Sequence, residues 1–183
     1  MKLKALTHKA PPGSLELLTA LGNGENGFGG TPVGSDPTKL GEWLDYCVHV
    51  AKAPPLSEYY LPQTSYWITD DSGFAVGLLR LRTQLNKELL NKGGHVGYYV
   101  APAYRQRGFA KGALGLALAN LRSKGVDRAL LTVESHNLAS LALVLAFGGE
   151  LEDERIDPET GLAFQRLWVE TDFCTKTNQQ ATE

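Results

Sequence analysis

The chain has 183 residues, of which 43% are hydrophobic and 21% charged, and this composition is typical of one folded globular domain. The formal net charge is −2, so no strong positive field favours nucleic acid or an anionic membrane as a partner. No apolar run is long enough to span a bilayer, and the start MKLKALTHKAPPG is a poor signal peptide, so we expect a cytoplasmic protein. Cys47 and Cys174 stand far apart, which indicates reduced thiols and neither a disulfide nor a zinc site.

The first third of the chain predicts helices around a glycine-rich loop. Residues 2–6 favour a short strand, and GSLELLTAL favours a helix capped by Ser14. Asp36 followed by Pro37 is typical of a helix start, and apolar residues then recur at helical spacing. GNGENGFGGTPVGSDP, between these helices, is the most loop-like segment, and AKAPPLSEYYLPQT predicts irregular structure.

From residue 65 the sequence favours strands that alternate with helices. SYWITD, the turn DSG and FAVGLLRLR predict a hairpin, and TQLNKELLNKGG connects it to the strand HVGYYVAP. The next helix, GFAKGALGLALANLRSKG, carries one apolar stripe and ends at Gly125. RALLTVE predicts a strand buried on both faces, Asn137 caps the helix LASLALVLAFGG, and LAFQRLWVE is the last strand. The central strand–helix–strand unit should be parallel and right-handed.

Two glycine-rich segments could approach a phosphate group. GNGENG matches G-x-G-x-x-G, but a dinucleotide fingerprint needs a buried strand before it and a helix after it, so we expect a flexible loop or the rim of an active site. RQRGFA does lie between a strand and a helix, where N–H groups of the first helical turn lack partners and the helix dipole favours an anion. Gly108 leaves room for close approach, so this turn predicts a pyrophosphate site.

RQRGFA resembles the acyl-CoA signature of the GNAT superfamily of N-acetyltransferases, Arg/Gln-x-x-Gly-x-Gly/Ala. Arg105, Gly108 and Ala110 occupy its defined positions. The similarity extends over about residues 65–170, through GGHVGYYVAPAYRQRGFAKGALGLAL and ALLTVESHNLASLALVLAFGGEL, and includes Asn137 and Ser140. SDPTKLGEWL, QTSYW and LNKELLNKGGHVGYYV are similar to an uncharacterised bacterial branch of predicted acetyltransferases.

The resemblance implies a single α/β domain of the GNAT type over residues 1–173. We expect a mixed central β-sheet with splayed parallel strands and helices on both faces. Residues 1–64 would form acceptor-side helices and a loop, residues 65–173 the acyl-CoA-binding core, and residues 174–183 a polar tail.

The resemblance also implies acetyl-CoA as co-substrate and no metal. The pantetheine arm would pair with the edge of the fourth family strand, and the pyrophosphate would meet the turn that follows it. Capping alone is a sufficient structural reason for Asn137. The implied cofactor-binding set is Tyr98, Tyr99, Val100, Arg105, Gln106, Arg107, Gly108, Phe109, Ala110, Lys111, Asn137 and Ser140.

The sequence departs from the family pattern at both acid–base positions. Relatives often place a carboxylate at the start of the fourth strand and a tyrosine after the fifth, whereas this chain has His95 and Val144 there. His95 is therefore one candidate base, or a histidine that orients the strand. Glu134 is the other candidate base, or a solvated glutamate. Tyr98 is a candidate donor to the leaving thiolate, or a packing residue.

We expect an N-acetyltransferase that moves an acetyl group from acetyl-CoA to a primary amine by direct attack on the thioester. The acceptor would be a small-molecule or peptide amine, with no role for nucleic acid or membrane, and a homodimer is a common state in such families. Alternatives are a non-catalytic acyl-CoA-binding or sensor domain, motivated by Val144, and an interaction module that has kept the fold. Arg80 and Arg82 share one face of a strand; a solvated face is the simpler interpretation, but beside an acceptor groove they would suit an acidic acceptor.

Overall fold

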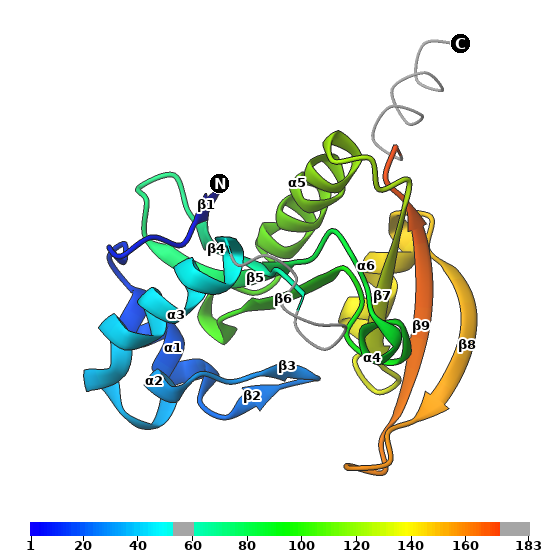
Figure 1. Ribbon diagram of the computed structural model, residues 1–183, viewed down its shortest axis with the longest axis horizontal. Helices are drawn as coiled ribbons and strands as arrows, with labels where there is room; N and C mark the ends of the chain where they lie inside the picture. The colour runs from blue at the N-terminus through cyan, green and yellow to red at the C-terminus, as the bar shows by residue number, and fades with distance from the viewer. Residues whose placement is uncertain (53–60, 173–183) are drawn as a thin grey trace.

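The computed structural model describes residues 1–52 and 61–172, and within them two antiparallel sheets stand side by side (Figure 1). The first sheet has the strand order β1-β4-β5-β6, and the second has the order β7-β9-β8. A separate small hairpin, β2–β3, projects toward the second sheet. The strand bounds are β1 (Lys2–Ala5), β2 (Gly24–Glu25), β3 (Phe28–Gly29), β4 (Thr64–Thr69), β5 (Ala75–Leu81), β6 (Val96–Val100), β7 (Arg128–Glu134), β8 (Glu150–Ile156) and β9 (Ala163–Glu170).

Helices cover both faces of the first sheet, and two neighbouring residues of β5 pack into the two apolar clusters that result. Leu78 packs into one apolar cluster with the N-terminal helices, whereas Leu79 packs into a second cluster with α5 and the second sheet. Because side chains alternate along a strand, both faces of β5 are buried. The helix bounds are α1 (Ser14–Leu21), α2 (Pro32–Ser35), η1 (Pro37–Lys39), α3 (Leu40–Lys52), α4 (Lys87–Asn91), η2 (Pro102–Tyr104), α5 (Phe109–Ser123) and α6 (Leu138–Ala146).

The described helices, those of residues 1–52 and 61–172, include none with the length and apolar character needed to cross a membrane.

Most helix boundaries follow the sequence prediction. The apolar stripe of α5 is fully buried, and the helix begins directly after Gly108. Asn137 caps α6 by accepting a hydrogen bond from Ser140 N, and Asp36 accepts one from Thr38 N at the start of η1. The prediction for Ser14 was wrong: it lies inside α1, where its hydroxyl donates to Pro11 O, and Gly13 precedes it with φ 81°.

Five elements were not predicted: β2, β3, α2, α4 and β8. β8 is an outer strand that pairs with β9 alone, so most of its side chains are exposed and its sequence ELEDERI has no apolar face. α4 lies in the expected connection, and the hairpin β2–β3 and helix α2 lie in the expected loop. Residues 53–60, part of the expected irregular segment, and the expected tail at 174–183 lie outside the described residues.

β6 and β7 flank α5 but form no strand ladder with each other. Every strand pairing in the described part of the chain is antiparallel. The expected parallel unit is therefore reduced to contacts near the start of β6, and beyond them the two strand edges face each other across a gap (Figure 1).

Candidate active site

Backbone and side-chain hydrogen bonds close the gap between β6 and β7 at one end. His95 N donates to Leu130 O at 2.8 Å, and Leu130 N donates to Nδ1 of His95 at 2.9 Å. Gly93 N donates to the Thr132 hydroxyl at 3.0 Å. A Cβ at Gly94 would lie 2.3 Å from Leu130 O, so only glycine lets the chains approach this closely. These contacts form the apex of a V-shaped cavity of about 460 Å³.

The side of β6 that faces the gap has free backbone groups. Arg82 N donates to His95 O, and Ala101 N donates to Val76 O, so odd-numbered residues of β6 pair with β5. In an antiparallel ladder alternate residues turn away from the partner strand. Tyr98 and Val100 therefore present their backbone groups to the cavity, except that Val100 O accepts a hydrogen bond from Arg105 Nε at 3.0 Å.

A tight turn between β6 and α5 forms one wall of the cavity. Gln106 has φ 59° and Gly108 has φ 82°, both in the left-handed region. A Cβ at Gly108 would meet nothing within 4 Å, so this glycine provides the backbone angle and bare space beside the turn. The first N–H groups of α5 have no intrahelical acceptor, and the helix dipole makes their surroundings positive. The turn has the geometry of an anion site.

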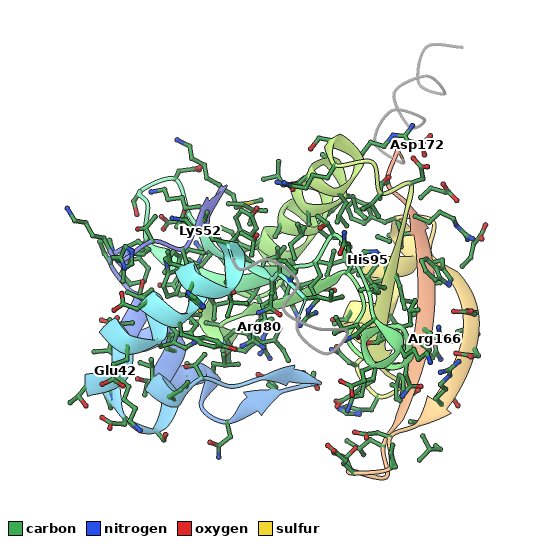
Figure 2. The ribbon with its side chains drawn as sticks, in the orientation of Figure 1. Glu42, Lys52, Arg80, His95, Arg166 and Asp172 are labelled. Carbon is green, nitrogen blue, oxygen red and sulfur yellow. The ribbon has the colours of Figure 1, made fainter. Side chains whose placement is uncertain are left out.

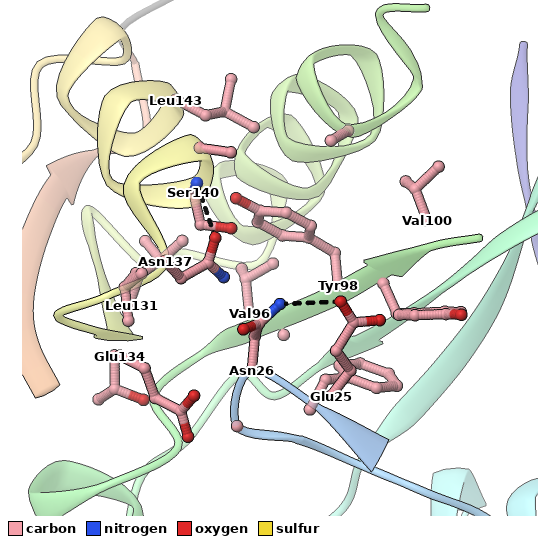
Figure 3. A pocket seen from close by; sticks show the side chains of 18 of the residues that line it. Glu25, Asn26, Val96, Tyr98, Val100, Leu131, Glu134, Asn137, Ser140 and Leu143 are labelled. Atoms are coloured by element: carbon pink, nitrogen blue, oxygen red, sulfur yellow. Dashed lines mark hydrogen bonds between the residues drawn. The ribbon is translucent and has the colours of Figure 1, made fainter. Parts of the chain in front are cut away.

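Helix α6 contributes the opposite wall, with a tyrosine between it and β6 (Figure 3). Asn137 Oδ1 accepts from Ser140 N at 3.2 Å, so its capping role is confirmed, and its side chain also lines the cavity. The Tyr98 ring reaches from β6 toward Ser140. Burial raises the pKa of Tyr98, Ser140 offsets this only in part, and no described group completes a hydrogen bond with the hydroxyl.

The hairpin β2–β3 crosses the mouth of the cavity. At its tip, Asn26 Oδ1 lies 3.1 Å from His136 Nε2, and a Cβ at Gly27 would lie 3.4 Å from Glu134 Oε1. Directly before this turn, Glu25 forms an ion pair of 2.6 Å with Arg105. The GNGENG segment is thus the rim of the cavity and has no dinucleotide-binding geometry, because helix α1 precedes it and a two-stranded hairpin follows.

The two candidate bases have different surroundings. The Glu134 side chain is 12% exposed, lines the cavity at the end of β7 and lies 3.5 Å from His136 Nε2. His95 lies in the interior between the sheets, is 7% exposed, does not line the cavity, and has its Nδ1 occupied by Leu130 N (Figure 2). Burial, followed by the charge of Arg82, lowers the pKa of His95 from 6.5 to about 4. This placement favours the orienting role for His95 and leaves Glu134 as the carboxylate beside the cavity.

The cavity brings together nearly all residues that the sequence singled out. Of the implied cofactor-binding set, only Arg107 lies outside it; its guanidinium stacks on Tyr104 at 5.5 Å and on Phe109 at 5.8 Å. Val144, at the position of the family tyrosine, is fully buried in the core. Sequence reasoning missed several lining residues that carry no motif, and these are Lys92, Thr132, Leu143 and Phe164.

Two arginines, one at the end of β5 and one directly after it, also line the cavity. Arg80 donates to Gly29 O at 2.9 Å, and its guanidinium lies 4.3 Å from the centre of the Phe28 ring. Arg82 donates to Gly94 O at 3.2 Å. The solvated face that the sequence favoured for these residues was wrong, because burial lowers the pKa of both, that of Arg82 to about 10.

No cluster of three or more His, Cys, Asp or Glu side chains suited to a metal ion occurs in residues 1–52 and 61–172.

Comparisons with known proteins agree with this geometry. Residues 36–148 match the model of the Acetyltransferase (GNAT) family. A mutant of the spermidine N-acetyltransferase SpeG from Vibrio cholerae superposes with a TM-score of 0.67 at 16% identity, covering 96% of this chain and 97% of that one. A SpeG chimera from Vibrio cholerae and hSSAT gives 0.63 at 18% identity, with 93% and 95% covered.

A more distant structure is an acetyltransferase of the GNAT family from Streptococcus pneumoniae, with a TM-score of 0.52, 15% identity, and 71% and 75% of the two chains covered. No curated protein matches the chain significantly. At these identities the structures show the fold alone, whereas the family model spans most of the chain. The expected α/β fold and the expected acyltransferase activity are both confirmed. The chain belongs to the acetyltransferase (GNAT) family.

Proposed function

We propose that the protein transfers an acetyl group from acetyl-CoA to a primary amine. The observation that carries this proposal is the joint placement of a free strand edge on β6 and the left-handed turn at Gly108 around one cavity. The strand edge suits the amides of an extended pantetheine arm, and the turn suits a pyrophosphate. Residues 65–173 would form this acyl-CoA-binding core, and residues 1–64 the acceptor side.

The residues present fit this co-substrate by their own chemistry. Tyr98 and Val100 offer backbone groups to the pantetheine, and Asn137 offers its amide from the opposite wall. Residues 106–111 offer N–H groups to the pyrophosphate, and Arg105, whose N–H donates to Pro102 O, offers its side chain. Lys111 adds a positive charge in the first turn of α5, where an anion would offset its conflict with the helix dipole. When bound, acetyl-CoA supplies an activated thioester for attack by an amine.

Two residues of the cavity are suited to proton transfer. Glu134 would accept the amine proton, directly or through one water molecule, because it is the carboxylate at the open end of β7. Tyr98 would donate a proton to the thiolate, because burial raises the pKa of its hydroxyl and this group reaches into the cavity beside Ser140. Tyr98 would thus take the role that Val144 cannot perform.

The experiment measures thiol release from acetyl-CoA by the purified protein with a panel of primary amines. We expect release that requires both an amine and the protein, and an acetylated amine as product by mass spectrometry. In a thermal-shift assay, acetyl-CoA at 100 times its dissociation constant should stabilise the fold by about 2.7 kcal/mol, whereas NAD should not. Stabilisation by NAD alone, with no release of thiol, would contradict the proposal.

A further inference from the structure

Arg80 and Arg82 place two guanidinium groups in the wall of the cavity. Arg80 lies on β5, and Arg82 follows the strand directly with its side chain on the same side. Arg80 donates to Gly29 O and Gly30 O, and Arg82 donates to Gly94 O. Neither forms an ion pair with any carboxylate of residues 1–52 and 61–172. A guanidinium has five N–H donors, so most donors of this pair have no acceptor among the residues that the structure describes.

Two of the other cations that line the cavity, Arg105 and Lys92, are paired with carboxylates. Glu25 binds Arg105, and Lys92 binds Asp157, which lies outside the cavity. Lys111 lies in the first turn of α5, and Glu134 lies across the cavity, beside the hairpin tip and His136. Within residues 1–52 and 61–172, no carboxylate pairs with Arg80 or Arg82, so the two form a positive patch on the side of the cavity nearest β5.

Burial makes this positive patch costly without an anion. Two like charges removed from water lose hydration and repel each other, and a bound anion would reverse both effects. The lowered pKa of Arg82 has this origin, since burial is its largest cause and the charge of Arg80 the second. The backbone carbonyls and the Phe28 ring hold the guanidinium groups in place, so little ordering is needed when an anion binds.

We propose that the amine acceptor carries a carboxylate, and that Arg80 and Arg82 bind it. This inference rests on the proposed acetyl transfer. A guanidinium matches a carboxylate through two parallel hydrogen bonds, which fixes the orientation of the acceptor as well as its position. With the carboxylate at β5, the amine of a small amino acid or of an acidic peptide would point across the cavity toward Glu134.

The same charges argue against a polyamine acceptor. The SpeG structures named above share the fold, and spermidine carries several positive charges along its length. Such a chain would meet Arg80 and Arg82 without an intervening carboxylate, and like charges in a partly buried site repel strongly. The charge pattern therefore separates this cavity from one built for a polycation.

Matched pairs of acceptors test the proposal in the thiol-release assay. 4-Aminobutyrate is compared with n-butylamine, and a short peptide with glutamate next to its N-terminus is compared with the same peptide carrying glutamine. Glycine and L-glutamate test the free amino acids, and spermidine tests the polycation. We expect kcat/KM at least tenfold higher for the carboxylate-bearing member of a pair, with the difference mainly in KM. The pair with the larger ratio identifies the source of the carboxylate.

Variants connect that preference to the two arginines. Arg80→Gln and Arg82→Gln should each reduce the carboxylate preference, the ratio of kcat/KM within a matched pair, by at least tenfold, and Arg82→Lys should restore part of it. Arg122→Gln, at the far end of α5, is the matched control for loss of one positive charge and should leave the preference unchanged. A variant that fails to bind acetyl-CoA is treated as misfolded. The carboxylate preference of the variant at the other arginine then tests the proposal.

The outcomes separate this inference from the proposed function. Equal or better use of n-butylamine or spermidine would overturn the carboxylate site while leaving acetyl transfer intact. Absence of both acetyl-CoA binding and thiol release would overturn the proposed function itself. If acetyl-CoA binds but no amine is consumed, glutarate is titrated onto the CoA-bound protein; a thermal shift lost in Arg80→Gln supports the site, and no shift overturns it.

Discussion

At the residue scale, Glu134 and His95 make opposite uses of their surroundings. Glu134 lies at the end of β7 beside the cavity, whereas Nδ1 of His95 accepts a hydrogen bond from Leu130 N at the closed apex. We predict that Glu134→Gln lowers kcat by about 10²–10⁴-fold while the dissociation constant for acetyl-CoA changes little. Steady-state thiol release and a binding titration check this.

Glu154→Gln is the control for that substitution. Glu154 lies on β8, outside the cavity, so the loss of its charge should leave kcat unchanged. Full activity in Glu134→Gln would show that the amine reaches the cavity already deprotonated, and that the site acts mainly by positioning.

Tyr98 allows a test that separates activity from stability. Its buried hydroxyl lies beside Ser140 but completes no hydrogen bond of regular geometry with a described residue, so removing it should cost little stability. We predict that Tyr98→Phe keeps or slightly raises the free energy of unfolding in urea, while kcat falls by about tenfold or more because the thiolate loses its proton donor. Tyr66→Phe, on β4 and outside the cavity, should not change kcat. A destabilised variant with normal kcat would instead mark Tyr98 as a packing residue.

At the scale of elements, the hairpin β2–β3 places a carboxylate next to the turn at Gly108. Glu25 pairs with Arg105 at 2.6 Å, so its negative charge lies close to where a pyrophosphate would bind. We predict that Glu25→Gln tightens acetyl-CoA binding several-fold, because one repulsion is removed and Arg105 becomes available. Isothermal titration measures the effect, which should shrink at high salt because Glu25 and Arg105 are partly exposed.

Glu16→Gln, on exposed α1, is the matched control and should leave the affinity unchanged. Weaker binding in Glu25→Gln would mean that the ion pair holds Arg105 in the orientation that acetyl-CoA needs.

The elements also show what a sequence can predict. The hairpin β4–β5, helix α5 and the Asn137 cap were predicted because each has a local signal: a turn, an apolar stripe or a capping side chain. β8 was missed because an exposed outer strand needs no apolar face. The role of Ser14 was misjudged because Gly13, which has a left-handed backbone angle, occupies the N-cap position of α1.

The candidate site likewise has parts that a local motif predicted and parts that depend on distant contacts. The turn at Gly108 and the wall at Asn137 were predicted through a motif and a resemblance. The crossing of the hairpin tip to Glu134 could not be predicted, because it depends on how two segments about a hundred residues apart meet in the fold. The closed apex at His95 likewise depends on contact with Leu130.

At the scale of the whole molecule, His95 should make stability depend on pH. Its pKa is about 4 in the folded chain, against 6.5 for a histidine in an unfolded chain, so the unfolded state binds more protons between these values. Stability is therefore complete above about pH 6.5 and is lost as the pH falls toward 4, by an amount on the order of 3 kcal/mol. Urea denaturation at a series of pH values measures this loss.

A variant separates His95 from the carboxylates. Asp157 has a pKa lowered to about 2 by hydrogen bonds from Lys92, Thr160 and Glu159 N, so its contribution is lost below the usual carboxylate range. His95→Gln keeps an acceptor for Leu130 N but does not titrate, and its stability should vary much less between pH 6.5 and 4. An unchanged pH dependence in this variant would assign the effect to other groups.

The most direct test of the acetyl-CoA site compares two glycines at opposite ends of α5. Gly108 has φ 82° and Gly125 has φ 79°, and a Cβ at either position would meet nothing within 4 Å. Glutamate at either site therefore imposes similar backbone strain, but only Gly108→Glu adds bulk and negative charge beside the turn. By isothermal titration, Gly108→Glu should weaken acetyl-CoA binding at least tenfold, about 1.4 kcal/mol, while Gly125→Glu leaves it unchanged. Equal affinity in both variants would contradict a pyrophosphate site at this turn.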